Sequence, residues 1–207
     1  MFTEIKYDSP TEERDLVNRT WAMRQDFDTR TYNNKIATNN FCGVTIVVAS
    51  LKFEEVGPSM SQIHGEPAFL AKMINKLLDN YGDLPEELQK IIDKAQYKTK
   101  RINHQTPNGN TDQDKNKNLW EELQKFKQLL NTQGVSVTIF TEREPCNNSG
   151  GPQNGCDVNL LKLLGNGMSI NHQHKLIYAF NNHTVPSWAF AARIIKIEVM
   201  PFSVEIL

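Results

Sequence analysis

The pattern of apolar and polar positions predicts an opening helix and then two strands. Residues 9–27, SPTEERDLVNRTWAMRQDF, begin with a capping box formed by Ser9 and Glu12, which predicts an amphipathic helix. Residues 28–40 lack periodicity and are predicted to form a loop. Residues 41–56, FCGVTIVVASLKFEEV, contain a β-branched run and then an alternating segment, which predicts a central strand and a turn into a second strand.

Helical spacing follows the second predicted strand. Residues 66–82 place apolar side chains three and four positions apart, and Gly82 is predicted to be a left-handed cap at the end of this helix. Residues 83–133 contain two amphipathic helical patterns around a polar stretch. We interpret residues 83–133 as a helical insertion.

The last third of the chain alternates strand and helix patterns again. Residues 135–144 predict a strand, residues 157–167 a short helix that stops at a glycine, and residues 174–180 another strand. Residues 187–200 predict a final helix, or a helix followed by a strand. Because strands alternate with helices, we predict an α/β fold of three layers whose later strands are parallel.

Composition is that of a globular protein, and the 207 residues are expected to form a single domain, residues 1–207. The chain lacks a signal-peptide pattern and any run of about 18 apolar residues, so we expect a soluble protein without a membrane partner. The net charge of −1 provides no global basic field, so nucleic-acid binding would depend on local patches.

Three cysteines are too few and too odd in number for a disulfide framework, and they suit a reducing compartment or a metal site. Cys42 begins the first predicted strand and is expected in the core. Cys146 directly follows the strand at 135–144, Cys156 precedes the helix at 157, and His64 precedes the helix at 66. Helix N-termini converge at the carboxyl ends of strands in α/β sheets, so we expect the last three side chains to meet.

One imidazole and two thiolates form a three-ligand set for zinc, with a fourth position open to water as in catalytic sites. Glu66 follows His64 by two residues and would face that open position without occupying it. There it could take a proton from water and deliver it to a substrate nitrogen. Zinc lowers the pKa of bound water to roughly 7, so this set predicts hydrolytic deamination.

Each candidate also has an ordinary structural interpretation. A histidine before a helix is usually a capping or packing residue, and an isolated cysteine is usually an inert buried thiol. Only their joint occurrence at element boundaries, with the glutamate in place, favours a metal site. Glu142 and Glu144 are interpreted as alternating strand-end residues, with a contact to the metal ligands as the alternative. His174 is interpreted as the start of a strand.

The motif HGE at 64–66, followed by PC at 145–146 and a second cysteine at 156, resembles the H-x-E and P-C-x-x-C signature of the zinc-dependent cytidine deaminase superfamily. The stretch FTEREPC is similar to nucleic-acid deaminases found as bacterial toxin domains and in related fungal proteins. Nine residues, NNSGGPQNG, separate the two cysteines where the signature has two, and they require a loop.

This resemblance covers about residues 40–200. It implies a cytidine-deaminase-like three-layer α/β/α sandwich with a mixed five-stranded sheet. It also implies that His64, Cys146 and Cys156 bind Zn²⁺, and that Glu66 is the general acid and base.

The resemblance also implies contacts to a substrate. Asn40 is the asparagine best placed to hold a sugar or base. Tyr32 and Phe41 border the asparagine-rich loop, and Trp188 begins the last predicted helix, so each could line a pocket in which a base stacks. Packing in the core is the alternative for all three aromatic residues.

Three functions are compatible with the sequence. The first is a nucleic-acid deaminase, with single- or double-stranded DNA favoured, that converts cytosine to uracil by zinc-hydroxide attack at C4. The second is a deaminase of free nucleosides or nucleotides. The third is a catalytically silent, zinc-supported binding module, and the presence of Glu66 argues against it. The chain would be a cytoplasmic enzyme or a toxin domain delivered from a larger carrier.

Overall fold

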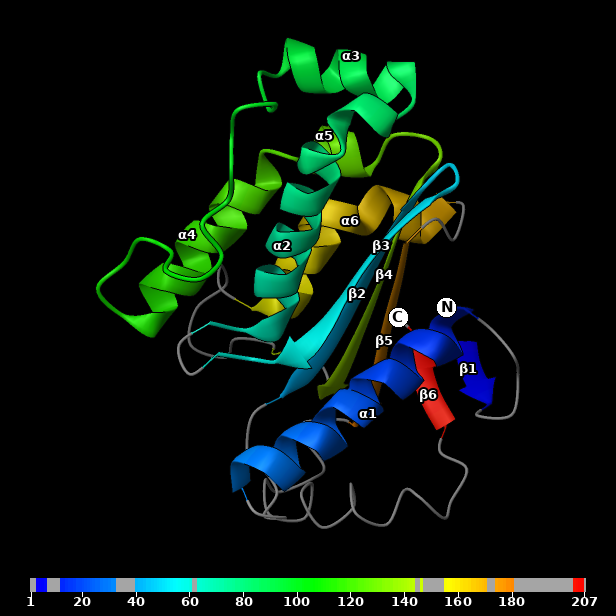
Figure 1. Cartoon of the computed structure of the whole chain (residues 1–207), viewed down its shortest axis with the longest axis vertical. Helices are drawn as coiled ribbons and strands as arrows, with labels where there is room; N and C mark the ends of the chain where they lie inside the picture. The colour runs from blue at the N-terminus through cyan, green and yellow to red at the C-terminus, as the bar shows by residue number, and fades with distance from the viewer. Residues whose placement is uncertain are drawn as a thin grey trace.

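The computed structural model shows a mixed α/β structure (Figure 1). It describes residues 3–6, 12–32, 40–60, 63–143, 146, 155–170, 174–180 and 203–206. The strands are β1 (Thr3–Lys6), β2 (Phe41–Val48), β3 (Leu51–Pro58), β4 (Val135–Arg143), β5 (His174–Phe180) and β6 (Ser203–Ile206). The helices are α1 (Glu12–Tyr32), α2 (Gly65–Asp79), α3 (Glu86–Lys94), α4 (Asp112–Gln124), α5 (Lys127–Leu130) and α6 (Cys156–Ile170), with a 3₁₀ turn at Tyr81–Asp83.

The six strands form one sheet in the order β1-β6-β5-β4-β2-β3. In the four strands from β5 to β3, β2 pairs antiparallel with both β3 and β4, whereas β4 pairs parallel with β5. The α/β class and the parallel pairing of the later strands are therefore confirmed. The five-strand expectation is not confirmed, because the sheet has six strands within the described residues, where β1 pairs with β6 and β6 pairs with β5.

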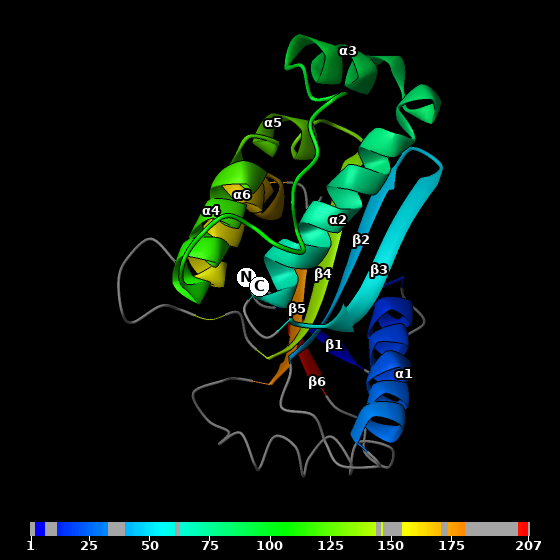
Figure 2. The same ribbon diagram turned by 60° about the vertical axis from the view of Figure 1, so that its left-hand side comes forward.

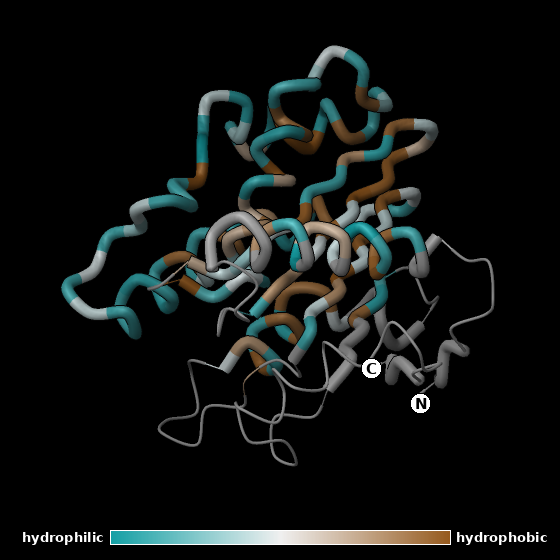
Figure 3. The backbone as a smooth tube through the Cα atoms, turned by 60° about the horizontal axis from the view of Figure 1, so that its bottom comes forward, coloured by the Kyte–Doolittle hydropathy of each residue, from teal (hydrophilic) through white to brown (hydrophobic). Residues whose placement is uncertain are grey.

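Helices cover both faces of the sheet (Figure 2). On one face, α1 lies against β2, β3 and β4. On the other face, α2 packs on β2 and β3, α6 packs on β5, and α4 packs on both α2 and α6. The apolar segments lie in the strands and in the helices beside them (Figure 3).

The hairpin of β2 and β3 is the strand pair that its sequence pattern predicts. Val44 and Ile46 are fully buried and belong to the apolar cluster that includes α2. A two-residue turn joins the strands, and its first residue, Ala49, has a φ of 52°, in the left-handed region that such turns use. On the opposite face, a Cβ atom at Gly43 would lie 2.8 Å from Cδ1 of Leu16 in α1. A larger residue at this position would therefore require side chains of α1 to shift.

Three predicted boundaries differ from the structure. Helix α1 continues to Tyr32, through residues that were predicted to form a loop. Gly82 is not a left-handed cap, because α2 ends at Asp79 and a 3₁₀ turn follows with ordinary backbone angles. Helix α6 passes through Gly165 and ends at Ile170. A glycine inside a helix costs about 1 kcal/mol, which the packing of neighbouring buried leucines can offset.

The helix predicted at 187–200 lies outside the described residues.

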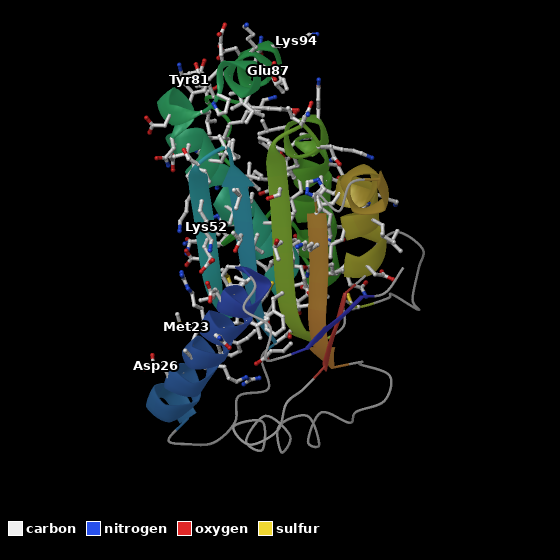
Figure 4. The ribbon with its side chains drawn as sticks, turned by 90° about the vertical axis from the view of Figure 1, so that its right-hand side faces the viewer. Met23, Asp26, Lys52, Tyr81, Glu87 and Lys94 are labelled. Carbon is white, nitrogen blue, oxygen red and sulfur yellow. The ribbon has the colours of Figure 1, made fainter. Side chains whose placement is uncertain are left out.

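The predicted insertion contains α3, α4 and α5. Helix α2 has 15 residues and is therefore about 22 Å long. Helix α3 follows the carboxyl end of α2, and Glu87 and Lys94 of α3 lie at the opposite end of the molecule from Asp26 of α1 (Figure 4). The segment between α3 and α4 returns along α2, where Ile102 hydrogen-bonds to Asn75, and α4 begins beside the first turn of α2, where Asn116 contacts His64 (Figure 2). No helix among the described residues is long and apolar enough to cross a bilayer.

Candidate metal centre

Three metal-ligand side chains meet where β4 ends and α2 and α6 begin. His64 is the N-cap residue of α2, Cys146 follows β4, and Cys156 is the first residue of α6. His64 Nδ1 lies 3.1 Å from Cys156 Sγ and 3.3 Å from Cys146 Sγ. All three ligand atoms lie within 4.8 Å of one another. The structure thus brings the three predicted ligands together in a group able to hold a metal ion, which we call the His-Cys-Cys cluster.

The backbone of His64 explains why its side chain is available to the cysteines. The residue is extended, with φ −65° and ψ 146°, as is typical of an N-cap, but its side chain makes no capping hydrogen bond. The capping interpretation is thus correct for the position of the residue and wrong for the role of its imidazole. His64 is exposed, Cys146 is half-buried and Cys156 is buried, so the cluster is accessible from the side of His64.

The longer spacer between the cysteines does not separate their sulfur atoms. The backbone N–H of Cys156 donates to Cys146 Sγ at 3.5 Å, and the N–H of Asp157 lies 3.5 Å from the carbonyl oxygen of Cys146. Cys146 therefore sits against the first turn of α6. The positive end of the helix dipole at that turn favours a thiolate.

The electrostatics of the cluster favour one thiolate. A hydrogen bond from Cys156, with a further contribution from His64, lowers the pKa of Cys146 to about 4. The same hydrogen bond with Cys146, together with burial, raises the pKa of Cys156. The hydrogen bond to Cys146 also raises the pKa of His64. A metal ion must displace protons from His64 and Cys156, so metal affinity is expected to rise with pH.

The geometry of the donor atoms fits zinc. Zinc bonds of about 2.3 Å to sulfur and about 2.0 Å to nitrogen, in tetrahedral geometry, place nitrogen and sulfur about 3.5 Å apart. The observed separations of 3.1 and 3.3 Å need to increase by only a few tenths of an ångström. Two sulfur donors and one imidazole also suit zinc better than magnesium or calcium, which prefer oxygen donors.

Glu66 approaches the cluster from the first turn of α2. Its side chain is buried, with 3% of the residue exposed. The hydroxyl of Thr141 donates to Oε1 at 3.2 Å, and Cys156 Sγ lies 3.8 Å from Oε2. Burial raises the pKa of Glu66, and the nearby His64 opposes that shift. A buried carboxyl group with a raised pKa is suited to both taking and returning a proton.

Asn40 is linked to Glu66 through one intervening residue. Its Nδ2 donates to Thr141 Oγ1 at 2.7 Å, and Thr141 in turn donates to Glu66. Asn40 is half-buried and immediately precedes β2. It therefore lies near the cluster, while its contact with a substrate stays a prediction.

Of the three predicted aromatic contacts, Phe41 is the one whose side chain belongs to the described residues. Phe41 is fully buried against α1, with Phe27 at 5.4 Å between ring centroids and the Arg24 guanidinium 4.6 Å from its ring. Side chains alternate along a strand, so Phe41 lies on the face opposite Cys42 and the cluster. This placement is the one that core packing predicts. Tyr32 is the last residue of α1, but the structure does not describe its side chain. Trp188 lies outside the described residues. The substrate roles of both stay predictions.

Sequence patterns did not reveal Arg24, Thr141 and Asn116, which lie beside the site or support it. Glu142 forms a fully buried, two-pronged ion pair with Arg24, at 2.7 Å and 3.0 Å, and also accepts the backbone N–H of Phe41 at 3.0 Å. Thr141 holds Glu66, and Asn116 accepts a hydrogen bond from the backbone of His64. Arg24 and Asn116 lie far along the chain from their partners, so no local spacing marks them. The strand-end interpretation of Glu142 is confirmed, and Glu144 lies outside the described residues.

Comparisons of the chain with protein-family models, curated proteins and solved structures return no match.

Proposed function

We propose that this protein is a zinc-dependent hydrolase that deaminates cytosine to uracil in nucleic acid, with DNA favoured. The supporting observation is the position of Glu66, a buried carboxyl group beside the His-Cys-Cys cluster but outside its ligand set. A structural zinc site has no use for such a group, because four protein ligands complete it. The cytidine-deaminase-like identity of the fold is part of this proposal.

The residues divide the reaction between them. His64, Cys146 and Cys156 would hold zinc, which when bound activates water for attack at C4 of cytosine. Glu66 takes the proton of that water and passes it to N3 of the base. It then carries the remaining proton of that water, from the oxygen now bonded to C4, to the departing amino group, so that cytosine and water become uracil and ammonia. Thr141 keeps the carboxylate oriented throughout, through its hydrogen bond to Oε1.

Access to the cluster is compatible with a polymer as substrate. His64 is exposed whereas Glu66 and Cys156 are buried, so an incoming base would pass His64 to reach the carboxyl group. A base in a polymer must leave its stack and enter a pocket while its backbone stays outside. The preference for DNA rests on the resemblance of FTEREPC to nucleic-acid deaminases.

The test compares the unaltered protein with Glu66→Ala and Glu66→Gln on cytidine, single-stranded DNA, duplex DNA and RNA, scored as conversion of cytosine to uracil. We expect conversion in a polymer, and a loss of about 100- to 10,000-fold in both variants, because proton transfer contributes that much to catalysis. Zinc content should be unchanged. Glu86→Gln is the matched control, because Glu86 is an exposed residue of α3.

The outcomes separate the three functions. Full activity in Glu66→Gln would show that the assignment of the proton carrier is wrong. Conversion of cytidine alone would favour the free-nucleoside deaminase. Stoichiometric zinc without conversion of any substrate would favour the silent binding module.

A further inference from the structure

Asn116 connects the helical insertion to the metal centre. It lies in the second turn of α4, and 7% of the residue is exposed. Its Oδ1 accepts a hydrogen bond from the backbone N–H of His64 at 2.9 Å. Helix α4 packs on α2 and α6, the two helices that carry His64 and Cys156 (Figure 2). A residue of the insertion therefore touches the backbone of a candidate metal ligand directly.

The backbone N–H of His64 needs an acceptor from outside its own helix. In a capping box, the side chain of the third helical residue accepts the N–H of the N-cap residue. The third residue of α2 is Pro67, which has no side-chain acceptor. The His64 imidazole is directed at the two cysteines and makes no cap. Asn116, 52 positions along the chain, supplies the missing acceptor.

The amide group of Asn116 is held in one orientation. Its Nδ2 donates to the carbonyl oxygen of Asp112 at 2.7 Å, one turn earlier in α4. A flipped amide would place a donor against the N–H of His64 and an acceptor against that carbonyl. The first turn of α4 is itself fixed by a capping box between Thr111 and Asp114. Asn116 is thus a rigid support.

We propose that Asn116 is a positioning residue of the metal centre, which fixes the backbone of His64 so that Nδ1 meets both cysteine sulfur atoms and thereby increases zinc affinity. The inference rests on the zinc site of the proposed function but not on the reaction. It gives α4 a role at the site, whereas α3 lies beyond the far end of α2. Partners that orient metal ligands typically change metal affinity 10- to 100-fold.

The experiment measures zinc affinity of the full chain by competition with a chromophoric chelator. Asn116→Leu removes the acceptor at similar volume, Asn116→Ala removes it without bulk, and Asn116→Asp retains an oxygen acceptor. Asn118→Ala is the matched control, because Asn118 is a half-buried asparagine of α4 that donates to the carbonyl of Asn108 and has no hydrogen bond to His64 among the described residues. We expect Asn116→Leu and Asn116→Ala to bind zinc about 10- to 100-fold more weakly. Asn116→Asp keeps the acceptor but loses the donation to Asp112, so it should lose less zinc affinity than Asn116→Leu or Asn116→Ala, and the control should stay within a few-fold of the unaltered protein.

Unchanged zinc affinity in both Asn116→Leu and Asn116→Ala would overturn the proposal. A second measurement, hydrogen exchange of the His64 backbone amide in the unaltered protein, tests the hydrogen bond to Asn116 even if the variants fail to fold. Slow exchange supports the hydrogen bond to Asn116, and exchange as fast as that of a fully exposed amide contradicts it.

The result is independent of turnover. If the unaltered protein binds zinc and the variants bind it equally well, Asn116 has no positioning role and the proposed deamination stands. If the variants lose zinc affinity but no substrate is converted, the positioning role stands and the proposed reaction fails. If the unaltered protein binds no zinc, both proposals fail.

Discussion

Thr141 lies between Asn40 and Glu66 and joins their side chains by hydrogen bonds. A hydroxyl group donates only one hydrogen bond, and because Thr141 accepts from Asn40, its proton is directed at Glu66. That donation favours the ionised form of the carboxyl group, whereas burial raises its pKa and favours the neutral form. Opposed influences of this kind keep both forms of Glu66 accessible, as a proton carrier requires.

His174, the first residue of β5, is a second buried ionisable side chain. Its Nδ1 accepts the backbone N–H of Val137 at 3.1 Å, and 2% of the residue is exposed. Its Nε2 has no hydrogen-bond partner within the described part of the chain. Burial lowers the pKa of His174 to about 4, so the folded protein holds this imidazole neutral.

This neutral imidazole predicts a loss of stability in acid. The unfolded chain takes up a proton at His174 below pH about 6.5, whereas the folded protein does so only near pH 4. The contribution of His174 to the free energy of unfolding is therefore complete above pH about 6.5 and falls by at most about 3 kcal/mol as the pH drops to about 4.

His174→Asn retains an acceptor for Val137 but does not titrate. Urea unfolding of the metal-free protein and this variant at several pH values between about 4 and 7 measures the difference, in which the titration of the metal ligands cancels. We expect the variant to have the flatter profile. Parallel profiles would show that His174 is protonated equally in the folded and unfolded states.

At the scale of elements, α1 is fastened to the sheet by a buried ion pair. Arg24 and Glu142 are both fully buried, and the guanidinium contacts both carboxylate oxygens. Glu142 is the penultimate residue of β4, which leads to Cys146. It also accepts a hydrogen bond from the backbone N–H of Phe41 in β2. The pair therefore connects α1 with the ends of two strands beside the metal centre.

Removing one partner of this pair should be strongly destabilising. Arg24→Met leaves the Glu142 carboxylate buried without its counter-charge, and we expect a loss of about 3–5 kcal/mol in the free energy of unfolding. The double variant Arg24→Met/Glu142→Gln removes both charges and keeps an acceptor for Phe41, so it should be more stable than Arg24→Met alone. Urea denaturation of the single and double variants measures both quantities. A loss below about 1 kcal/mol in Arg24→Met would mean that water reaches Glu142.

At the scale of the whole molecule, the cluster joins segments that are distant along the chain. His64 begins α2, Cys146 follows β4 and Cys156 begins α6, so a metal bound to all three would hold these elements together. A metal that binds the folded chain and not the unfolded one stabilises it by mass action. The cluster is thus expected to couple zinc binding to folding.

Removal of zinc with a chelator should lower the Tm, and zinc added at about 100 times its Kd should restore about 2.7 kcal/mol of stability. Cys156→Ser should show little response to either treatment. Cys42→Ala is the control, since Cys42 is a buried cysteine outside the cluster, and its response should match that of the unaltered protein. An equal response in Cys156→Ser would place the zinc elsewhere.

Local patterns in the sequence determined the elements around the site. The β-branched run before Ala49 and the alternation after it specify the β2–β3 hairpin, and the apolar spacing of residues 66–82 specifies α2. The types and positions of His64, Cys146 and Cys156 specify a metal-ligand set, because each stands next to the end of an element. These features depend on side-chain periodicity and on neighbours a few residues apart, which a sequence displays directly.

Tertiary structure alone decided the contacts between distant residues. It paired β1 with β6, which come from opposite ends of the chain, and it buried Arg24 against Glu142, 118 positions away. It also placed Phe41 on the face of α1 and brought Asn116 to the backbone of His64. None of these contacts has a local spacing, because each depends on how whole helices and strands pack. The sequence by itself therefore determined which groups could bind a metal, and the packing decided which other groups support them.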